Sequence, residues 1–433
     1  MKYYLGIDLG ATSGRHVIGY LEGSDIVLKE VHRFKTCMDE SSDGLVWDIP
    51  RIYNEIKLGI QKAFALYPKI ESIAIDTWGV DYVLMDGDKE ITPYYAYRNV
   101  RCAKSAKKVH EIMDFGTMYG KTGIQFAAFN TIYQLYDDLE KGRLEHATDY
   151  LMLPSYFTYK LTGVKTHEYT NESTGALLDA KTGGYDYGLL DQFGLPRKLF
   201  GEIHQPGQVV GELLPEIQQE VGGNAKVVLC ASHDTGSAFE AVDVEDDSII
   251  LSSGTWSLLG VKSKQPIINE ASLKANYTNE GGVGYIRFLK NIMGMYLANR
   301  VVEETGLDFK TIDREIVHST YIETFDVNDP SLNAPSKMKE AILALLSKNP
   351  PANDIDLFAS IYRSQALCYK KAMDELEGIT GKKYRKIYII GGGAKNKYLN
   401  QLVREFTNLE VIAMPIEATA LGNIKSQMKG QKQ

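Results

Sequence analysis

Short apolar runs alternate with amphipathic stretches along the chain, and this alternation predicts an α/β protein. Residues 3–10 and 15–23 are apolar runs joined by a short polar turn, which predicts two paired strands. Residues 47–66 carry apolar side chains at helical spacing, with Asp48 as the expected N-cap. The same reasoning predicts strands within 70–86, 226–234, 248–263 and 386–393, and helices over 287–306, 355–378 and 394–406.

The pattern restarts near the middle of the chain. Residues 5–21 and 249–262 both consist of a strand, a turn rich in Gly, Ser and Thr, and a second strand. A chain of 433 residues is also too long for one hydrophobic core. We therefore predict two similar domains, 1–243 and 244–433.

Composition narrows the class of protein. The chain is 44% hydrophobic and 24% charged, an ordinary balance for a folded domain, and no apolar run is long enough for a membrane helix. The net charge of −8 argues against a broad nucleic-acid surface, although a few backbone N–H groups could still bind a nucleotide's phosphates. The N-terminus lacks the apolar region of a signal peptide. Four scattered cysteines read as reduced thiols, so we expect a cytoplasmic protein.

One carboxylate sits where the predicted strand 226–234 gives way to a helix. Open α/β sheets place ligands at such strand tips, and a helix N-terminus favours an ionised carboxylate. Asp234 is therefore a candidate catalytic residue. The alternative is that Asp234 is an ordinary N-cap, the commoner role of an Asp at a helix start.

Two Gly- and hydroxyl-rich turns are candidate phosphate sites. In "DLGATSGR" the carboxylate of Asp8 precedes a turn and Arg15, so Asp8 could hold Mg²⁺ through water while the turn grips phosphates. The second turn, "LSSGTWSLLG", carries Thr255. The alternative for both is a plain hairpin turn.

Three other motifs carry weaker signals. "IDTWGVD" places two carboxylates and Trp78 around Gly79, which suits a polyol, whereas a core Trp is the structural alternative. "IIGGGAKN" lacks the third glycine of a dinucleotide site, since position 396 is Asn. "GKT" at 120–122 lacks the leading glycine and strand of a P-loop.

Taken in order along the chain, "DTWGVD", "ASHDT" and "SSGTWSL" resemble the motifs of the FGGY carbohydrate kinases, and the resemblance covers essentially the whole chain. It implies two actin-like ATPase domains with ribonuclease-H-like cores, which flank a central cleft and close on ATP, Mg²⁺ and a sugar. By position it implies that Asp234 is the general base. The other implied site residues are Gly79, His233, Thr235 and Asn291 for the sugar, and Ala11, Thr12, Ser13, Gly14, Arg15, Thr255, Asn299 and Gly392 for the nucleotide.

The resemblance also implies a reaction. The expected activity is ATP-dependent phosphorylation of a ketose, with L-rhamnulose converted to its 1-phosphate. L-fuculose and D-xylulose are alternative substrates, and a non-kinase actin-like ATPase or sugar-binding relative is the alternative class. A monomer or homodimer is expected, with no nucleic-acid or membrane partner. Two residues depart from the family pattern: Asn99 stands where an Asp is expected, and Asn299 replaces a longer side chain. Compared with the family, the second domain is also expected to be shortened at its end.

Overall fold

The structure is a computed structural model that describes residues 1–244, 246–414 and 417–430. It divides into two compact units, each of which contains both helices and strands. The first unit comprises residues 1–241, 262–288 and 419–433, and the second comprises 242–261 and 289–418. The predicted α/β class is confirmed. No described helix is both long and apolar enough to cross a membrane.

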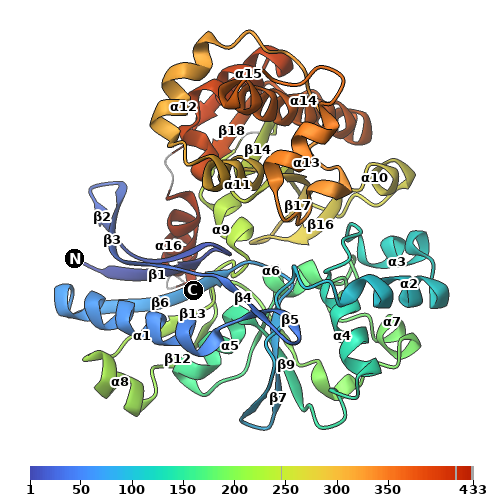
Figure 1. The fold of residues 1–433 in the computed structure, drawn as a ribbon. Coiled ribbons are helices and arrows are strands. Elements are labelled where there is room, and N and C mark those ends of the chain that lie inside the picture. Colours follow the sequence, from blue (N-terminus) through green and yellow to red (C-terminus); the bar gives the residue numbers. More distant parts are fainter. Residues whose placement is uncertain (245, 415–416, 431–433) are drawn as a thin grey trace. The chain divides into compact units, whose positions relative to one another are not determined.

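A six-stranded sheet in the order β12-β13-β6-β1-β2-β3 forms the centre of the first unit (Figure 1). Strand β1 is antiparallel to β2 and parallel to β6, so the C-terminal ends of β1 and β6 lie at the same edge of the sheet. The strands of this sheet are β1 (Tyr3–Leu9), β2 (Ser13–Glu22), β3 (Asp25–Lys35), β6 (Ile70–Thr77), β12 (Val209–Glu212) and β13 (Lys226–Val228).

Helix α1 (Ile49–Leu66) covers this sheet for the reasons its sequence predicts. The carboxylate of Asp48 accepts a hydrogen bond from the backbone N–H of Arg51, and Pro50 occupies the first turn. Ile52, Ile56 and other apolar residues of α1 are buried in the same core as the strands. The helix and its cap are therefore as expected.

A second hydrophobic core in the first unit is mostly helical. Its helices include α2, α4 and α7, which Figure 1 shows grouped beside the small sheet β8-β7-β9. The remaining elements of the first unit are β4 (Met38–Ser41), β5 (Gly44–Trp47), β7 (Tyr82–Asp86), β8 (Lys89–Ile91), β9 (Asp149–Met152), β10 (His167–Glu168), β11 (Ile203–His204), β16 (Thr278–Gly281), α2 (Cys102–Ile112), α3 (Phe115–Thr122), α4 (Thr131–Glu140), α5 (Leu153–Thr162), α6 (Tyr169–Glu172), α7 (Tyr187–Gln192), α8 (Pro215–Val221), α9 (Asp234–Glu240) and α10 (Glu270–Lys274).

The last helix, α16 (Ala418–Gly430), lies almost wholly in the first unit, although it is the end of the chain. Figure 1 shows it in dark red against the blue strands. Its Gln427 donates a hydrogen bond to the carbonyl of Leu5 on β1 (3.1 Å) and accepts one from Ser72 on β6 (2.6 Å). Gly422 touches α9 so closely that an added Cβ would lie 1.7 Å from the carbonyl oxygen of Ser237.

The second unit repeats the topology of the first. Its strands lie in the order β17-β15-β14-β18-β19. When these strands are numbered along the chain, this is the order third, second, first, fourth, fifth. The strands β3-β2-β1-β6-β13 of the first unit, numbered in the same way, lie in the same order. As in the first unit, the first strand pairs antiparallel with the second and parallel with the fourth. This shared order is the actin-like, ribonuclease-H-like arrangement, and it confirms the expected fold class of each unit. The elements are β14 (Ser248–Ser253), β15 (Trp256–Ser263), β17 (Ile286–Met293), β18 (Lys386–Ile390), β19 (Glu410–Ala413), α11 (Tyr296–Thr305), α12 (Phe309–Glu315), α13 (Met338–Leu345), α14 (Asp354–Thr380) and α15 (Lys397–Thr407).

Two sequence predictions need correction. The stretch 287–306 is not one helix: strand β17 ends at Met293, and helix α11 begins at Tyr296. The strand expected over 226–234 is short, since β13 ends at Val228 and 229–233 run as irregular chain into α9. That irregular chain is held at Leu229, whose N–H donates to the carbonyl of Gln208 (2.9 Å).

Candidate active site

Two carboxylates lie side by side at the ends of β1 and β6. Asp8 and Asp76 are register partners in the parallel pair, so their side chains leave the sheet at the same level. Asp8 is paired with Arg15, whose Nη2 lies 2.7 Å from Oδ2 and whose Nε donates to the same oxygen (2.8 Å). The predicted phosphate-binding Arg15 is thus engaged with Asp8 in this structure.

Asp76 is the more unusual of the two. It is completely buried, and its Oδ2 accepts a hydrogen bond of 2.6 Å from the amide of Asn423 on α16. Its Oδ1 is buried and has no hydrogen-bond partner among the residues that the structure describes. Burial, reinforced by the charge of Asp8, raises the pKa of Asp76 well above the usual range. The structure therefore holds a buried carboxylate oxygen that is ready for a further donor or a cation.

Asp234 begins helix α9 and faces the same region. His233 occupies the N-cap position and makes no side-chain cap bond, so Asp234 is the first helical residue and is not the cap. Its Oδ1 accepts hydrogen bonds from the N–H (2.5 Å) and the hydroxyl (3.1 Å) of Thr235. The side chain keeps 30% of its surface exposed. Burial raises the pKa of Asp234, and the neighbouring Asp8 raises it further, whereas His233 lowers it.

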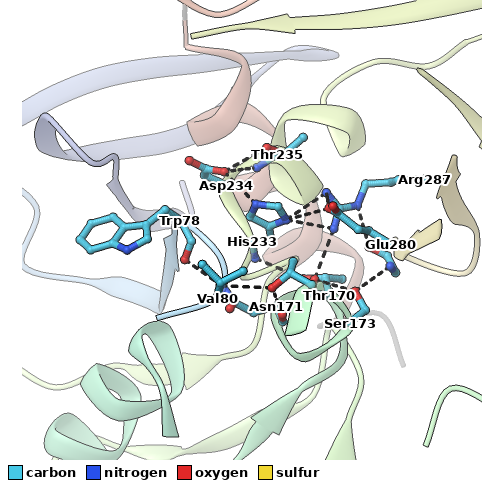
Figure 2. A network of polar contacts seen from close by, with 12 residues as sticks. Trp78, Val80, Thr170, Asn171, Ser173, His233, Asp234, Thr235, Glu280 and Arg287 are labelled. Atoms are coloured by element: carbon cyan, nitrogen blue, oxygen red, sulfur yellow. Dashed lines mark hydrogen bonds and ion pairs between the residues drawn. The ribbon is translucent and has the colours of Figure 1, made fainter. Parts of the chain in front are cut away.

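His233 joins Asp234 to a buried network (Figure 2). The imidazole Nε2 lies 3.4 Å from Oδ1 of Asp234, and Nδ1 lies 3.1 Å from both terminal nitrogens of Arg287. Glu280 on β16 pairs with Arg287 at 3.1 Å. Burial opposes ionisation, but the charge of Arg287, together with the neighbouring His233, holds the pKa of Glu280 below its ordinary value. The network is thus a chain of charged and polar groups that leads to the Asp234 carboxylate.

Glu168 fixes the backbone that carries His233. Its buried carboxylate accepts hydrogen bonds from the N–H groups of Thr170 (2.9 Å) and Asn171 (3.2 Å) at the start of α6. The same carboxylate accepts from the N–H (3.1 Å) and the hydroxyl of Ser232. One side chain therefore caps a helix and anchors the irregular segment that delivers Asp234.

Trp78 and Asp81 of the "IDTWGVD" motif are buried in the interior of the first unit. Asp81 is fully buried and accepts hydrogen bonds from the indole N–H groups of Trp47 (2.7 Å) and Trp78 (2.9 Å) and from the N–H of Tyr97 (3.1 Å). Its carboxylate is accordingly occupied within the protein. Trp78 is buried, in agreement with the structural alternative of a core Trp, and the carboxylate of Asp81 is buried beside it.

Gly79 lies in a tightly packed turn that includes a strained neighbour. A Cβ at Gly79 would lie 2.9 Å from the hydroxyl of Thr174. Val80 adopts a left-handed conformation with φ of 68°, which is rare for a β-branched residue. Thr131 and Gln134 donate to the Val80 carbonyl (2.9 and 3.1 Å) and hold it in place. Strain of this kind persists at functional sites when the surroundings over-determine it.

The first hairpin turn is shorter than the motif suggested. Its turn comprises residues 10–12, because Ser13, Gly14 and Arg15 belong to β2. The hydroxyl of Thr36 donates to the carbonyl of Gly10 (2.6 Å) and fixes the turn, which leaves Thr12 exposed. Gly14 is needed for packing, since an added Cβ would lie 2.4 Å from the ring of Phe34.

Three predicted nucleotide residues lie on segments that converge within the second unit. Thr255 lies in the β14–β15 turn, and its carbonyl accepts from the N–H of Tyr296 at the start of α11, the helix that carries Asn299. Gly391, directly before the exposed Gly392, would bring an added Cβ within 2.8 Å of the carbonyl oxygen of Ser253. The predicted sugar residue Asn291 lies half-buried on β17.

A magnesium ion fits the oxygen donors of the first unit. Among the described residues no group of three or more His, Cys, Asp or Glu side chains is arranged to hold a metal ion. Protein-bound Mg²⁺, however, keeps several waters and needs only one or two carboxylates beside its phosphate ligands. Asp8 and the unpartnered Oδ1 of Asp76 satisfy that requirement.

Sequence reasoning missed the residues that support Asp234. Glu280 in "TNEGG", Arg287 in "RFLKNIMGMYL" and Asn423 in "EATALGNI" lie in stretches that resemble the family, but nothing in the sequence assigns these side chains a role. Their roles depend on contacts with distant segments. The one available signal was the position of Arg287 within an apolar run. A charged side chain among apolar residues is expected to be buried and to need a buried partner.

Comparison with known proteins completes the description. The profile of the FGGY family of carbohydrate kinases, N-terminal domain, matches residues 3–239, and that of the C-terminal domain matches residues 249–430. The chain belongs to the FGGY family of carbohydrate kinases. This FGGY chain is 40% identical to a rhamnulokinase of Oceanobacillus iheyensis over 98% of its own length and 92% of the relative's. It is 38% identical to a rhamnulokinase of Bacillus subtilis, over 99% and 90% of the two chains.

Solved structures of sugar kinases share the fold of this FGGY protein. A gluconate kinase from Lactobacillus acidophilus matches with a TM-score of 0.82 at 18% identity, covering all of this chain and 89% of that one. A Plasmodium falciparum glycerol kinase with ADP matches with a TM-score of 0.77 at 14% identity, covering all of this chain and 90% of that one. The predicted family and the expectation of a carbohydrate kinase are both confirmed.

Proposed function

We propose that this FGGY kinase transfers the γ-phosphoryl group of ATP to the 1-hydroxyl of L-rhamnulose, which yields L-rhamnulose 1-phosphate and ADP. The observation that carries this proposal is the identity of 36–40% to proteins named rhamnulokinase over nearly the full chain. The arrangement around Asp234 supplies a chemical basis.

Asp234 is the proposed general base. Phosphoryl transfer has a loose transition state, so the protein mainly positions groups and neutralises charge. The sugar oxygen forms a bond to the γ-phosphorus while the bond from that phosphorus to the bridging oxygen of ADP breaks. The hydroxyl proton passes to the Asp234 carboxylate. A partly exposed carboxylate whose pKa is raised by burial suits this task, because a base works best when its pKa approaches the operating pH.

The remaining site residues are assigned as proposals. We assign Gly79, His233, Thr235 and Asn291 to the sugar, and the turn from Ala11 to Arg15 with Thr255, Asn299 and Gly392 to the nucleotide. Asp8, through water and beside Asp76, would hold Mg²⁺, which supplies positive charge to the phosphates when bound. On this assignment Arg15 would exchange part of its pairing with Asp8 for a phosphate oxygen.

Three features of organisation belong to the same proposal. The two domains divide near residues 243/244, although the segment 262–288 and helix α16 belong to the first unit, and domain closure on the substrates would exclude water from the reaction. The enzyme works in the cytoplasm. It is a monomer or a homodimer.

The decisive experiment measures ADP formation with L-rhamnulose, L-fuculose and D-xylulose, with and without Mg²⁺, and identifies the phosphorylated position by NMR. We expect the highest kcat/KM with L-rhamnulose, a 1-phosphate product, and no turnover without Mg²⁺. A clear preference for another ketose would overturn the substrate assignment. ATP hydrolysis that no sugar stimulates would instead favour the non-kinase ATPase class.

The Asp234→Asn variant tests the base. Loss of a general base typically costs about 10²–10⁴-fold in rate, so kcat should fall by that factor while ATP binding and thermal stability stay unchanged. Asp246→Asn is the matched control, because the Asp246 side chain is 99% exposed and its contact with Lys382 is long (4.0 Å). Near-normal turnover by Asp234→Asn would show that another group takes the proton.

A further inference from the structure

Arg287 is a fully buried cation whose N–H groups all point to acceptors of the first unit. Its Nε donates to the carbonyl of Gly281 (2.7 Å), and one terminal nitrogen donates to the carbonyl of Thr170 (3.3 Å). Both terminal nitrogens also lie 3.1 Å from Nδ1 of His233. A planar guanidinium held at this many points has a fixed orientation.

This orientation decides which nitrogen of His233 carries the hydrogen. A guanidinium has only donors, so the Nδ1 atom that faces it must present a lone pair. The hydrogen of the neutral ring then lies on Nε2, which is 3.4 Å from Oδ1 of Asp234. Figure 2 shows the ring between Arg287 and Asp234.

The competing tautomer meets two unfavourable contacts. Glu280 lies 3.3 Å from Nδ1 and could accept a hydrogen there. That hydrogen would, however, face the N–H groups of Arg287, and the lone pair on Nε2 would face the carboxylate of Asp234. Arg287 therefore outweighs Glu280 in setting the state of the ring.

The consequence falls on one oxygen of Asp234. Within the part of the chain that the structure describes, the hydrogen bonds to this carboxylate come from Thr235 and end on Oδ1, the oxygen that also faces Nε2 of His233. Oδ1 is thus the oxygen that the protein holds. Oδ2 is left to accept the hydrogen of a substrate hydroxyl.

We propose that Arg287 is a positioning residue that holds His233 in the tautomer with hydrogen on Nε2, so that this hydrogen fixes Oδ1 of Asp234 and leaves Oδ2 as the proton acceptor. The role in catalysis rests on the proposed function. The tautomer itself does not, and it can be measured in the free protein.

The test is ¹⁵N NMR of the protein labelled at histidine, with the His233 signals assigned by their loss in His233→Gln. The wild type should show a protonated Nε2 and an unprotonated Nδ1. A protonated Nδ1 in the wild type would overturn the proposal, and this outcome does not depend on whether any variant folds.

Two variants separate Arg287 from Glu280. Arg287→Lys replaces the planar guanidinium with a single ammonium group. The ring hydrogen of His233 should therefore shift toward Nδ1, and kcat should fall by about ten- to hundredfold, with a smaller change in KM. Glu280→Gln, the matched variant, should leave the hydrogen on Nε2.

The proposal is wrong if Glu280→Gln moves the hydrogen, or if a folded Arg287→Lys leaves both tautomer and kcat unchanged. A protein that shows the expected tautomer but phosphorylates no ketose would refute the proposed function alone.

Discussion

At the scale of single residues, the motifs draw attention to positions such as Asp234, but only the contacts show which groups surround each side chain. Asp234 was found because a strand tip followed by an Asp and a helix start is visible in the sequence. Its supports, Glu280 and Arg287, lie more than 40 positions further along, and no local pattern links them to it. Spacing along the chain predicts where a side chain emerges, but only packing determines its partners.

Asn99 shows how a departure from a family pattern can have a local cause. Its amide donates to the carbonyls of Asp43 (2.9 Å) and Leu45 (3.0 Å), while its carbonyl accepts from the N–H of Arg101 (3.0 Å). A carboxylate could not donate either bond and would face two carbonyl oxygens. The Asn is therefore required by this backbone.

Asp81 should make stability depend on pH. Burial raises the pKa of Asp81 from 3.8 to about 6, against the hydrogen bonds that stabilise its charge. The folded protein then binds this proton more tightly than the unfolded chain does. This proton therefore contributes its full stabilisation below pH 4. As the pH rises from 4 through 6, the free energy of unfolding falls by up to about 3 kcal/mol.

The measurement compares unfolding free energies of the wild type and Asp81→Asn between pH 4 and pH 7. The stability of the wild type relative to the variant should decline across that window. Asp246→Asn, at an exposed carboxylate, should show no such trend. An equally flat difference for Asp81→Asn would mean that the buried carboxylate keeps an ordinary pKa.

At the scale of elements, periodicity worked where one face of an element is buried. Helix α1 was predicted with its cap because its apolar residues recur at helical spacing. The stretch 287–306 misled because Phe288 and Ile292, which fit a helical stripe, are buried on strand β17. Gly294 ends that strand beside the β14–β15 turn, where an added Cβ would lie 2.6 Å from the backbone of Trp256. This packing, which separates strand from helix, involves residues too distant for a sequence window to detect.

The contact between α16 and α9 predicts a sharp response to one methyl group. Gly422→Ala would place a Cβ 1.7 Å from the Ser237 carbonyl oxygen, so the two helices would have to separate. We expect a loss of about 1–3 kcal/mol in the free energy of unfolding, as for other overpacked sites, together with a lower kcat because α9 carries Asp234.

Gly378→Ala is the control for that substitution. Gly378 lies within helix α14, and an added Cβ there meets nothing within 4 Å. This variant should gain about 0.5–1 kcal/mol, the usual advantage of Ala over Gly in a helix. If Gly422→Ala also stabilised the protein, the described contact between the helices would be wrong.

At the scale of the whole molecule, the restart of the sequence pattern correctly predicted a repeated sheet order. What the pattern could not show is that the end of the chain belongs to the first unit, because this depends on contacts such as those of Asn423 with Asp76 and of Gln427 with Leu5. Both pairs lie more than 340 positions apart, beyond any local signal.

A chain that stops after residue 417 tests this assignment. Removal of α16 would expose buried polar groups of β1 and β6, so backbone hydrogen exchange should accelerate in those strands. Strands β14 and β18 of the second unit should keep their protection. Faster exchange confined to β14 and β18 would contradict the placement of α16.

The position of α16 also bears on how the protein is synthesised. This helix comes after the second unit in the sequence, so on the ribosome β1 and β6 are synthesised long before the helix that packs against them. Asp76 can receive its amide partner only after the second unit has been synthesised. Completion of this part of the first unit is consequently delayed by the synthesis of the second, whatever the order in which the rest of the polypeptide collapses.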